Sequence, residues 1–398
     1  MFKFLAKKKN TQPSNKNQTH VSITLSNHLL NRSRNSNVVF SPLSIHVVLN
    51  VIAAGSKGQT HNQLLSFLKA KNINELNALS SQLVSTIMVD GSPVGGPRLS
   101  FANGVWVEQT VSLKPSFKKV VETVHKAACN QVDFQTRAGE VAKEVNLWAE
   151  RQTNGLIKDI LPASAINNST RLIFANAIYF KGAWCEKFDP SNTKDFDFHL
   201  LDGSKVLVPF MTSKKKQFLS KYDNFKVLAL PYENGNDKRH FTMYIYLLDV
   251  KDGLPSLIQR VGSQSDFLER HVPHQKVEIG QFLIPKFKIS FGFEASDMLK
   301  ELGLLLPFSS TEGLSEMGNT YADEKLNVSS IQHKSFVEVN EKGTEAAAVT
   351  AAVMMKCALK ETYDTVDFVA DHPFLFVIKE DTSGAVLFMG QVVNPTIN

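Results

Sequence analysis

Residues 341–358 read Glu-Lys-Gly-Thr-Glu-Ala-Ala-Ala-Val-Thr-Ala-Ala-Val-Met-Met-Lys-Cys-Ala, and this stretch constrains the fold more than any other. It has no charged side chain between Glu345 and Lys356, and it has no proline. Alternate side chains of a strand face opposite sides, so the even positions from Thr344 to Met354 would share one face. These positions are uncharged and mostly small, which predicts a strand that buries this face and leaves Glu345 in water.

An alanine-rich helix is the alternative for the same stretch. Alanine has the highest helix propensity, and residues 345–352 are long enough for two turns. The local sequence favours neither structure. The uncharged run is bounded by charge, with Glu338 and Glu341 before it and Lys360 after it, which suits a segment that is an exposed loop in one state and a buried strand in another.

Four segments together resemble one protein family, the serpins. Glu341-Lys-Gly-Thr-Glu-Ala-Ala-Ala348 resembles the hinge of the serpin reactive-centre loop. The matches to the second-helix, central-sheet and C-terminal signatures are Val38–Ile45, Phe174–Trp184, and Asp371–Ile378 with Gly384–Pro395. Their order and spacing agree with the family over roughly residues 20–398. Ala102–Trp106 and Gln391–Pro395 resemble plant members, of the serpin-Z type, most closely.

The arrangement of apolar segments predicts the fold class. Many strands with helices between them, in no regular alternation, indicate an α+β fold. The resemblance implies the serpin fold, with three β-sheets, about eight or nine helices and an exposed reactive-centre loop over about residues 343–367. We expect a single domain over residues 21–398, preceded by a disordered, lysine-rich segment over residues 1–20.

Individual elements follow from local signals. Ser41 and Pro42 are typical of a helix start, and the helix through residues 45–54 would end at Gly55. Apolar periodicity predicts further helices over residues 21–34, 139–152 and 295–302. Strands are predicted over 101–108, 171–181, 226–231, 240–248, 373–379 and 385–392, and residues 277–291 alternate in the same way.

Charge and cysteine content exclude several classes of protein. The net charge of +6 over 398 residues is mild, and no basic stripe with aromatic residues indicates a nucleic-acid binder. The clusters Lys7–Lys9 and Lys214–Lys216 are interpreted as solvated surface, with a nuclear-import signal or an anionic ligand site as alternatives. Three cysteines (Cys129, Cys185 and Cys357) in no metal-binding spacing fit a reducing compartment without disulfides, metals or cofactors.

The location is predicted from the N-terminal residues. The opening Met-Phe-Lys-Phe-Leu-Ala-Lys-Lys-Lys lacks the apolar core of a signal peptide, and no stretch is long enough to span a membrane. We therefore expect an intracellular protein, cytoplasmic or nuclear, that acts as a monomer without membrane or nucleic-acid partners.

Enzymatic chemistry has little support. The sequence has no G-x-S-x-G, H-E-x-x-H, P-loop or G-x-G-x-x-G motif, and His271 and His274 flank a proline and so do not form a helical metal pair. Lys356 beside Cys357 would lower the pKa of the thiol, which keeps a cysteine hydrolase as a minor alternative. The main hypothesis is an endopeptidase inhibitor, not an enzyme.

The resemblance implies a suicide mechanism against serine, or also cysteine, proteases. The protease forms an acyl-enzyme on the loop, and the freed hinge inserts into the central sheet and disables the protease. By the family's usual count the cleaved bond is Cys357–Ala358, and a register one residue shorter puts Lys356 in the specificity pocket. The hinge residues by the same resemblance are Glu341, Gly343, Thr344, Glu345, Ala346, Ala347 and Ala348.

The resemblance also implies two groups of residues that control sheet opening. Ser41, Ser44, Asn176 and His333 match a polar cluster beneath the opening, and Trp184 matches an aromatic residue where the hinge enters. Taken without the resemblance, His333 is an ordinary buried histidine and Trp184 a core tryptophan. A non-inhibitory serpin that binds or scaffolds is the competing function, and the uncharged hinge argues against it.

Overall fold

The computed structural model describes residues 13–309, 313–320, 325–344 and 365–397. Within these ranges nine α-helices accompany the strands, and the mixture confirms the α+β class. The helices are α1 (Pro13–Arg32), α2 (Pro42–Ala54), α3 (Gly58–Phe67), α4 (Ile73–Gln82), α5 (Pro115–Thr123), α6 (Phe134–Gln152), α7 (Leu254–Ser263), α8 (Phe267–Arg270) and α9 (Ser296–Glu301).

Three larger sheets and one two-stranded ribbon organise the described strands, which confirms the predicted three-sheet fold. The central sheet has the order β13 (Phe287–Glu294), β15 (Ser330–Val339), β5 (Leu172–Ala183), β2 (Arg98–Glu108) and β4 (Ala128–Val132), with β16 (Gly343–Thr344) also paired to β5. The seven-stranded sheet has the order β1 (Val38–Phe40), β19 (Val386–Val392), β18 (Phe374–Glu380), β10 (Phe241–Leu248), β9 (Phe225–Pro231), β8 (Gln217–Lys221) and β11 (Lys276–Val277).

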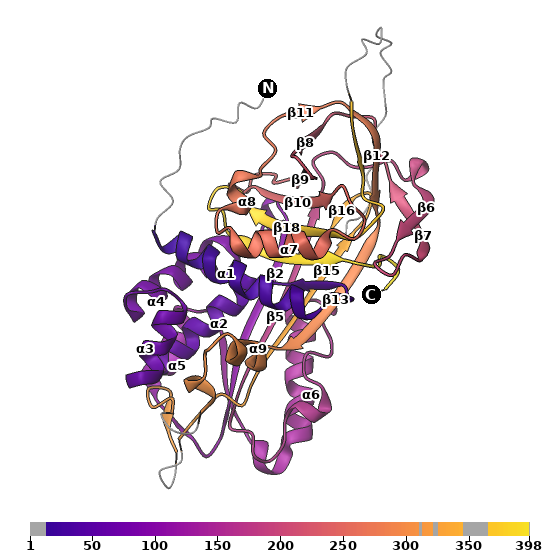
Figure 1. The fold of residues 1–398 in the computed structure, drawn as a ribbon. Helices are drawn as coiled ribbons and strands as arrows, with labels where there is room; N and C mark the ends of the chain where they lie inside the picture. The colour runs from indigo at the N-terminus through magenta and orange to yellow at the C-terminus, as the bar shows by residue number, and fades with distance from the viewer. Residues whose placement is uncertain (1–12, 310–312, 321–324, 345–364, 398) are drawn as a thin grey trace.

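The four-stranded sheet lies beside the other two. Its order is β17 (Val366–Val369), β12 (Ile279–Pro285), β7 (Lys205–Met211) and β6 (Lys194–His199), and the ribbon joins β14 (Gly318–Asn319) to β3 (Ser112–Leu113). Figure 1 shows α1 to α5 gathered on one side of the molecule, and α6 alongside the lower part of the central sheet. The central sheet is therefore covered by helices on part of its surface only.

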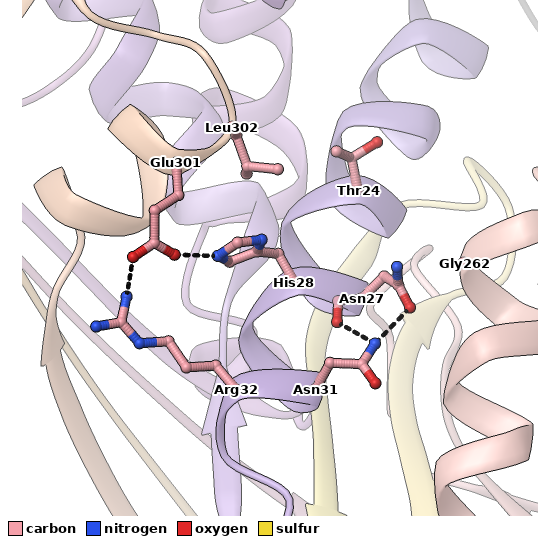
Figure 2. Close-up of a pocket in the computed structure, with 8 residues that line it drawn as sticks. All are labelled: Thr24, Asn27, His28, Asn31, Arg32, Gly262, Glu301 and Leu302. Atoms are coloured by element: carbon pink, nitrogen blue, oxygen red, sulfur yellow. Dashed lines mark hydrogen bonds and ion pairs between the residues drawn. The ribbon is translucent and has the colours of Figure 1, made fainter.

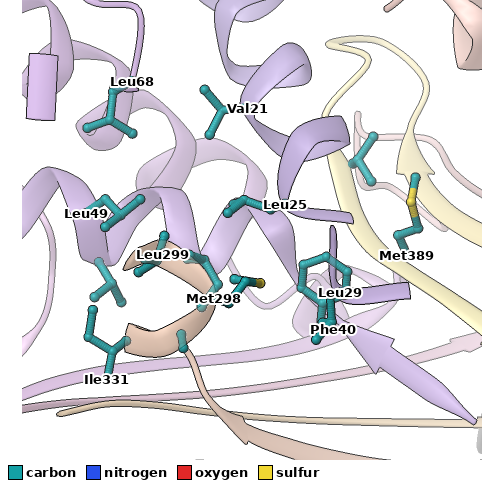
Figure 3. Close-up of a cluster of buried hydrophobic side chains, with 14 of the residues drawn as sticks. Val21, Leu25, Leu29, Phe40, Leu49, Leu68, Met298, Leu299, Ile331 and Met389 are labelled. Atoms are coloured by element: carbon teal, nitrogen blue, oxygen red, sulfur yellow. The ribbon is translucent and has the colours of Figure 1, made fainter. Parts of the chain in front are cut away.

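The core of the helical side is continuous with both large sheets. Figure 3 shows Val21, Leu25 and Leu29 of α1 facing side chains of α2, α9, β15 and β19. All of these side chains are buried, and together they remove a large apolar area from water, which is the main favourable term in folding. The contacts join the N-terminal helix to the last strand, so residues far apart in sequence form one body.

The N-terminal segment differs from the expectation. Helix α1 begins at Pro13, so residues 13–20, which we expected to be disordered, are helical, while residues 1–12 lie outside the described residues. The helix extends toward the N-terminus because its polar turns also make contacts. Gln18 is buried and donates to Ser22 Oγ at 2.7 Å, and Asn17 donates to Lys69 O at 2.7 Å.

Candidate functional site

The chain turns sharply at the upper end of the central sheet. After β15 ends at Val339, the bridge Asn340↔Gly343 closes a tight hairpin, and β16 pairs antiparallel with β5 through Gly343↔Ala183 and Thr344↔Gly182. The parallel β15–β5 ladder has already ended at Phe336↔Tyr179. The hinge therefore enters the sheet as a short strand between β5 and the end of β15.

Only glycine fits at position 343. Its φ of +146° is rarely adopted by other residues, and an added Cβ would lie 2.0 Å from the carbonyl oxygen of Gly182. The close approach of the two backbones thus explains why the sequence has glycine at this point of the hinge.

Thr344 is held by an aromatic pair. The side chain of Thr344 is fully buried, and its hydroxyl lies 2.8 Å from Tyr232 Oη. Tyr232 stacks on Trp184 with ring centroids 4.5 Å apart, and Trp184 Nε1 donates to Asn340 O at 2.9 Å. Burial raises the pKa of Tyr232 far above its usual range, so its hydroxyl remains a neutral hydrogen-bonding group. Trp184 therefore lies beside the hinge, in contact with Tyr232 and Asn340.

Glu341 anchors the other end of the hinge. Its carboxylate accepts from Thr193 Oγ1 at 2.8 Å and pairs with Lys286 Nζ at 3.1 Å, and its carbonyl accepts from Phe188 N at 2.9 Å. Burial acts to raise the pKa of Glu341, but hydrogen bonds from its own backbone, Thr193 and Lys286 outweigh burial and hold the pKa below its ordinary value. The carboxylate is therefore ionised and fixes the start of the hinge.

We expect Glu341→Gln to lower the free energy of unfolding by about 1–2 kcal/mol at pH 7, because the charge-assisted bond to Lys286 is lost while the amide can still accept from Thr193. Urea unfolding at pH 7 measures the difference. The matched control is Glu338→Gln, since Glu338 lies 3.9 Å from Lys288 in a more exposed pair. An equal loss in both variants would contradict the special role of Glu341.

The predicted polar cluster is assembled around His333. Ser41 N donates to His333 Nε2 at 3.1 Å, so this nitrogen must be unprotonated. The hydrogen therefore sits on Nδ1, which donates to Asn176 Oδ1 at 2.6 Å. Ser44 joins through its backbone, because its N–H donates at 3.2 Å to Ser41 Oγ, and Ser41 is the residue that caps helix α2.

Two members of this network were not predicted. Asn176 Nδ2 donates to Asn103 Oδ1 on β2, and Ser335 Oγ on β15 donates to Val39 O at 2.7 Å. The network thus links β2, β5, β15 and the segment that enters α2. It crosses the β5–β15 seam through the bond from His333 to Asn176, because these two residues are ladder partners.

Burial lowers the pKa of His333 to about 3, so the imidazole is neutral at physiological pH. Burial likewise lowers the pKa of His46 and of His125 to about 4. An unfolded chain would bind protons at these histidines below about pH 6.5, while the folded chain would not until pH 3–4. The folded state consequently loses stability as pH falls through this window.

We expect the free energy of unfolding to fall between pH 7.5 and pH 5, by about 2 kcal/mol for each of these histidines. Thermal unfolding across this range measures the slope, and ordinary carboxylates contribute little above pH 5. His333→Gln is expected to flatten the slope relative to wild type, and His274→Gln, at an exposed histidine, serves as the control substitution. An unchanged slope in His333→Gln would show that His333 titrates normally.

A surface pocket of about 440 Å³ lies elsewhere, between α1, α7 and α9 (Figure 2). Glu301 occupies its side, bound to His28 Nε2 at 2.7 Å and to Arg32 Nη1 at 3.0 Å, and Asn31 bonds to Asn27. The pocket contains none of the predicted site residues. The candidate site is therefore the hinge with the seam beneath it, rather than a pocket.

The remaining predicted residues lie outside the described residues. These are Glu345, Ala346, Ala347 and Ala348 of the hinge, and Lys356, Cys357 and Ala358 at the reactive bond. Among the described residues, Cys129 and Cys185 are free cysteines, and no cluster of potential metal ligands is present. In the same ranges no helix is both long and apolar enough to cross a membrane.

The fold and the hinge define a class of protein. The family model described as serpin (serine protease inhibitor) matches residues 16–395, so the chain belongs to the serpin family, whose characteristic role is protease inhibition rather than catalysis. This confirms the resemblance seen in the sequence.

Several plant serpins are similar to this chain over nearly its whole length. The chain is 55% identical to Serpin-ZX of Arabidopsis thaliana over 380 residues, which cover 95% of this chain and 97% of that protein. It is 56% identical to Serpin-ZXA of Oryza sativa subsp. japonica over 362 residues, 91% of either chain. The solved structure of Arabidopsis AtSerpin1 in its native stressed conformation superposes with a TM-score of 0.90 at 53% identity, covering 98% of this chain and 100% of that one.

Proposed function

We propose that the chain is a suicide inhibitor of serine endopeptidases, and of cysteine endopeptidases with a similar cleavage preference. The observation that carries the proposal is the pairing of Gly343 and Thr344 with β5, because it is the first rung of an antiparallel strand. Cleavage beyond this rung would free the following residues to extend it by strand addition.

The register of the sheet supports the insertion. Seven ladder pairs, Ser330↔Ile173 to Phe336↔Tyr179, join β15 to β5. One register follows from the pair Gly343↔Ala183 and would place position 353 opposite Ile173 of β5. The other follows from the bridge Asn340↔Gly343 and would place position 353 opposite Ser330 of β15. These two residues are already partners, so the two registers agree, and the new strand would end before Lys356 and Cys357.

The composition of the loop fits this strand. In that register the even positions follow Thr344 toward the buried side of the sheet, where β5 contributes Ile178 and Phe180. Alanine and threonine at these positions bring no charge into the core, and burying a charge would cost several kcal/mol. A non-inhibitory carrier or scaffold has no need of this pattern and is the less favoured function.

The chemistry belongs to the protease. Its serine hydroxyl, or cysteine thiol, would attack the carbonyl carbon of Cys357, or of Lys356 in the shorter register. The peptide bond breaks, the amine of the next residue leaves with a proton, and the acyl-enzyme remains attached to the hinge side of the loop. Insertion would then carry the attached protease away from its docking position before water completes hydrolysis.

Incubation of the purified chain with trypsin, chymotrypsin and a papain-like cysteine protease tests the proposal. We expect a one-to-one complex that survives denaturing electrophoresis. Mass spectrometry should show that the released peptide begins at residue 358 or 357. Cleavage of the loop without a complex and without a gain in thermal stability would overturn the inhibitory function in favour of a non-inhibitory serpin.

A further inference from the structure

The hairpin that joins β9 to β10 carries a nearly buried ion pair that the inhibitory site does not include. Arg239 and Asp237 have side chains only 13% and 8% exposed, and Arg239 Nη2 lies 2.5 Å from Asp237 Oδ2. A second bond runs from Arg239 Nε to Asp237 Oδ1 at 2.9 Å. Such a two-pronged pair fixes the orientation of both side chains.

Arg239 also fastens the hairpin to a segment far away in sequence. Its Nη1 donates to the carbonyls of Ile87 and Val89, both at 2.7 Å, at the end of the π-helical turn Leu83–Ile87 that follows α4. Asn236 N donates to Val94 O at 2.8 Å. Gly91 makes the close approach possible, because a Cβ there would lie 2.4 Å from Asp237 Oδ2.

The same hairpin begins at the residue that holds the hinge. Tyr232 N donates to Phe241 O at 2.9 Å and closes the hairpin, and Glu233 N donates to Ala183 O at 2.7 Å on β5. Tyr232 in turn contacts Thr344 and stacks on Trp184. A continuous set of contacts therefore runs from the turn after α4, through the ion pair, to the first rung of the inserting strand.

We propose that Arg239 and Asp237 are positioning residues for loop insertion, which hold Tyr232 where it captures Thr344 and so set the fraction of encounters that end in a trapped protease. The inference rests on the proposed inhibitory function. An antiparallel strand extends more easily when its first residue pair is already formed, because forming that first pair loses most of the conformational entropy. A hairpin released from its anchor would let this rung fray before the acyl-enzyme is hydrolysed.

Arg239→Met in the full chain tests the proposal, because it removes the bonds to Asp237, Ile87 and Val89 but keeps much of the volume. We expect the number of inhibitor molecules consumed per protease trapped to rise roughly threefold or more, while the rate of loop cleavage is unchanged. Arg239→Lys, which can keep the charge pair but not all the bonds, should lie between Arg239→Met and wild type. The control Arg270→Met removes an exposed pair between Arg270 of α8 and Asp266, which precedes that helix, and should behave as wild type.

Hydrogen exchange of residues 340–344 provides a readout that needs no protease. We expect faster exchange there in Arg239→Met than in wild type and Arg270→Met, in conditions where all three remain folded. If wild type forms no complex, the inhibitory function fails, yet the exchange experiment still measures the coupling. Two results for Arg239→Met would overturn the inference and leave the ion pair with a stabilising role only. One is unchanged hydrogen exchange at residues 340–344. The other is an unchanged number of inhibitor molecules consumed per protease trapped, together with a lowered melting temperature.

Discussion

Replacing Thr344 with arginine is expected to convert the chain from an inhibitor of its target protease into a substrate. The protease would still cleave the loop, but the denaturant-stable complex would disappear. Thr344 is fully buried and hydrogen-bonded to Tyr232, so a guanidinium at this position would be shielded from solvent, and the described contacts of Thr344 include no carboxylate to pair with it. Burying an unpaired charge costs several kcal/mol, which is more than the stabilisation from one residue pair of a β-ladder.

The expected result follows from competition between two rates. Insertion must be faster than hydrolysis of the acyl-enzyme, and each 1.4 kcal/mol added to its barrier slows it about tenfold. Arginine at the first rung therefore shifts nearly all encounters to hydrolysis. The measurement is the yield of covalent complex on a denaturing gel, together with the amount of cleaved chain.

Glu345→Arg is the matched control for this substitution. In the register of β16, position 345 would lie opposite Lys181, which is partly exposed, and on the face away from Tyr232. Arginine there is expected to reduce the complex yield far less than arginine at 344. Equal yields from Thr344→Arg and wild type would show that the face defined by Thr344 does not enter the core.

Elements with a local signal were predictable from the sequence. Ser41 caps α2 through Ser44 N, proline follows at the first position and the helix ends before Gly55, all as expected. The apolar run predicted over residues 171–181 is the central strand β5, and the strands predicted over 226–231 and 240–248 are the paired strands β9 and β10. In these cases one short segment contains both the signal and the structure.

Alternation predicts which side chains share a face, but not which sheet a strand joins. The alternation over residues 277–291 shifts phase after Ile279 and again after Ile284. The structure places Val277 at the end of β11 in the seven-stranded sheet, and divides the rest at Lys286 into β12, in the four-stranded sheet, and β13, at the edge of the central sheet. Pro285 has no N–H to donate, so the ladder is weakened where the chain changes sheets. The phase shift between Ile284 and Phe287 marks the break between the two strands, but it does not tell which sheet each strand joins.

The partners of the hinge were missed for a related reason. Tyr232 lies 112 residues from Thr344, and Thr193 lies 148 residues from Glu341. Asn103 was visible only as part of a plant-like motif, although it accepts from Asn176. Tertiary contacts between distant segments have no periodicity or spacing, so only the folded chain brings them together.

Thr350 is expected to replace the bond at the centre of the seam once the loop inserts. If the pairings of Gly343 with Ala183 and with Asn340 are extended into the inserted loop, position 350 would fall opposite Asn176 on β5 and opposite His333 on β15. Insertion would separate these two residues and break their 2.6 Å hydrogen bond. A threonine hydroxyl can accept from His333 Nδ1–H and donate to Asn176 Oδ1, so it can bridge the pair that it divides.

Thr350→Lys is therefore expected to stop insertion midway and abolish the covalent complex. The ammonium group has donors only, so it would face the N–H of a neutral imidazole whose pKa is about 3, and burial of the charge would cost several kcal/mol. Complex yield and the melting temperature of the cleaved chain measure the effect, and both should fall below wild type.

Thr350→Val and Thr350→Ser separate the hydroxyl from the volume of the side chain. Valine leaves His333 Nδ1–H without an acceptor in the inserted state, so the cleaved chain should lose about 1–3 kcal/mol while the uncleaved chain keeps its stability. Serine keeps the hydroxyl and should retain most of the complex. Because the register alone selects position 350, equal melting temperatures for the cleaved valine variant and cleaved wild type would mean that insertion follows another register or stops before it reaches His333.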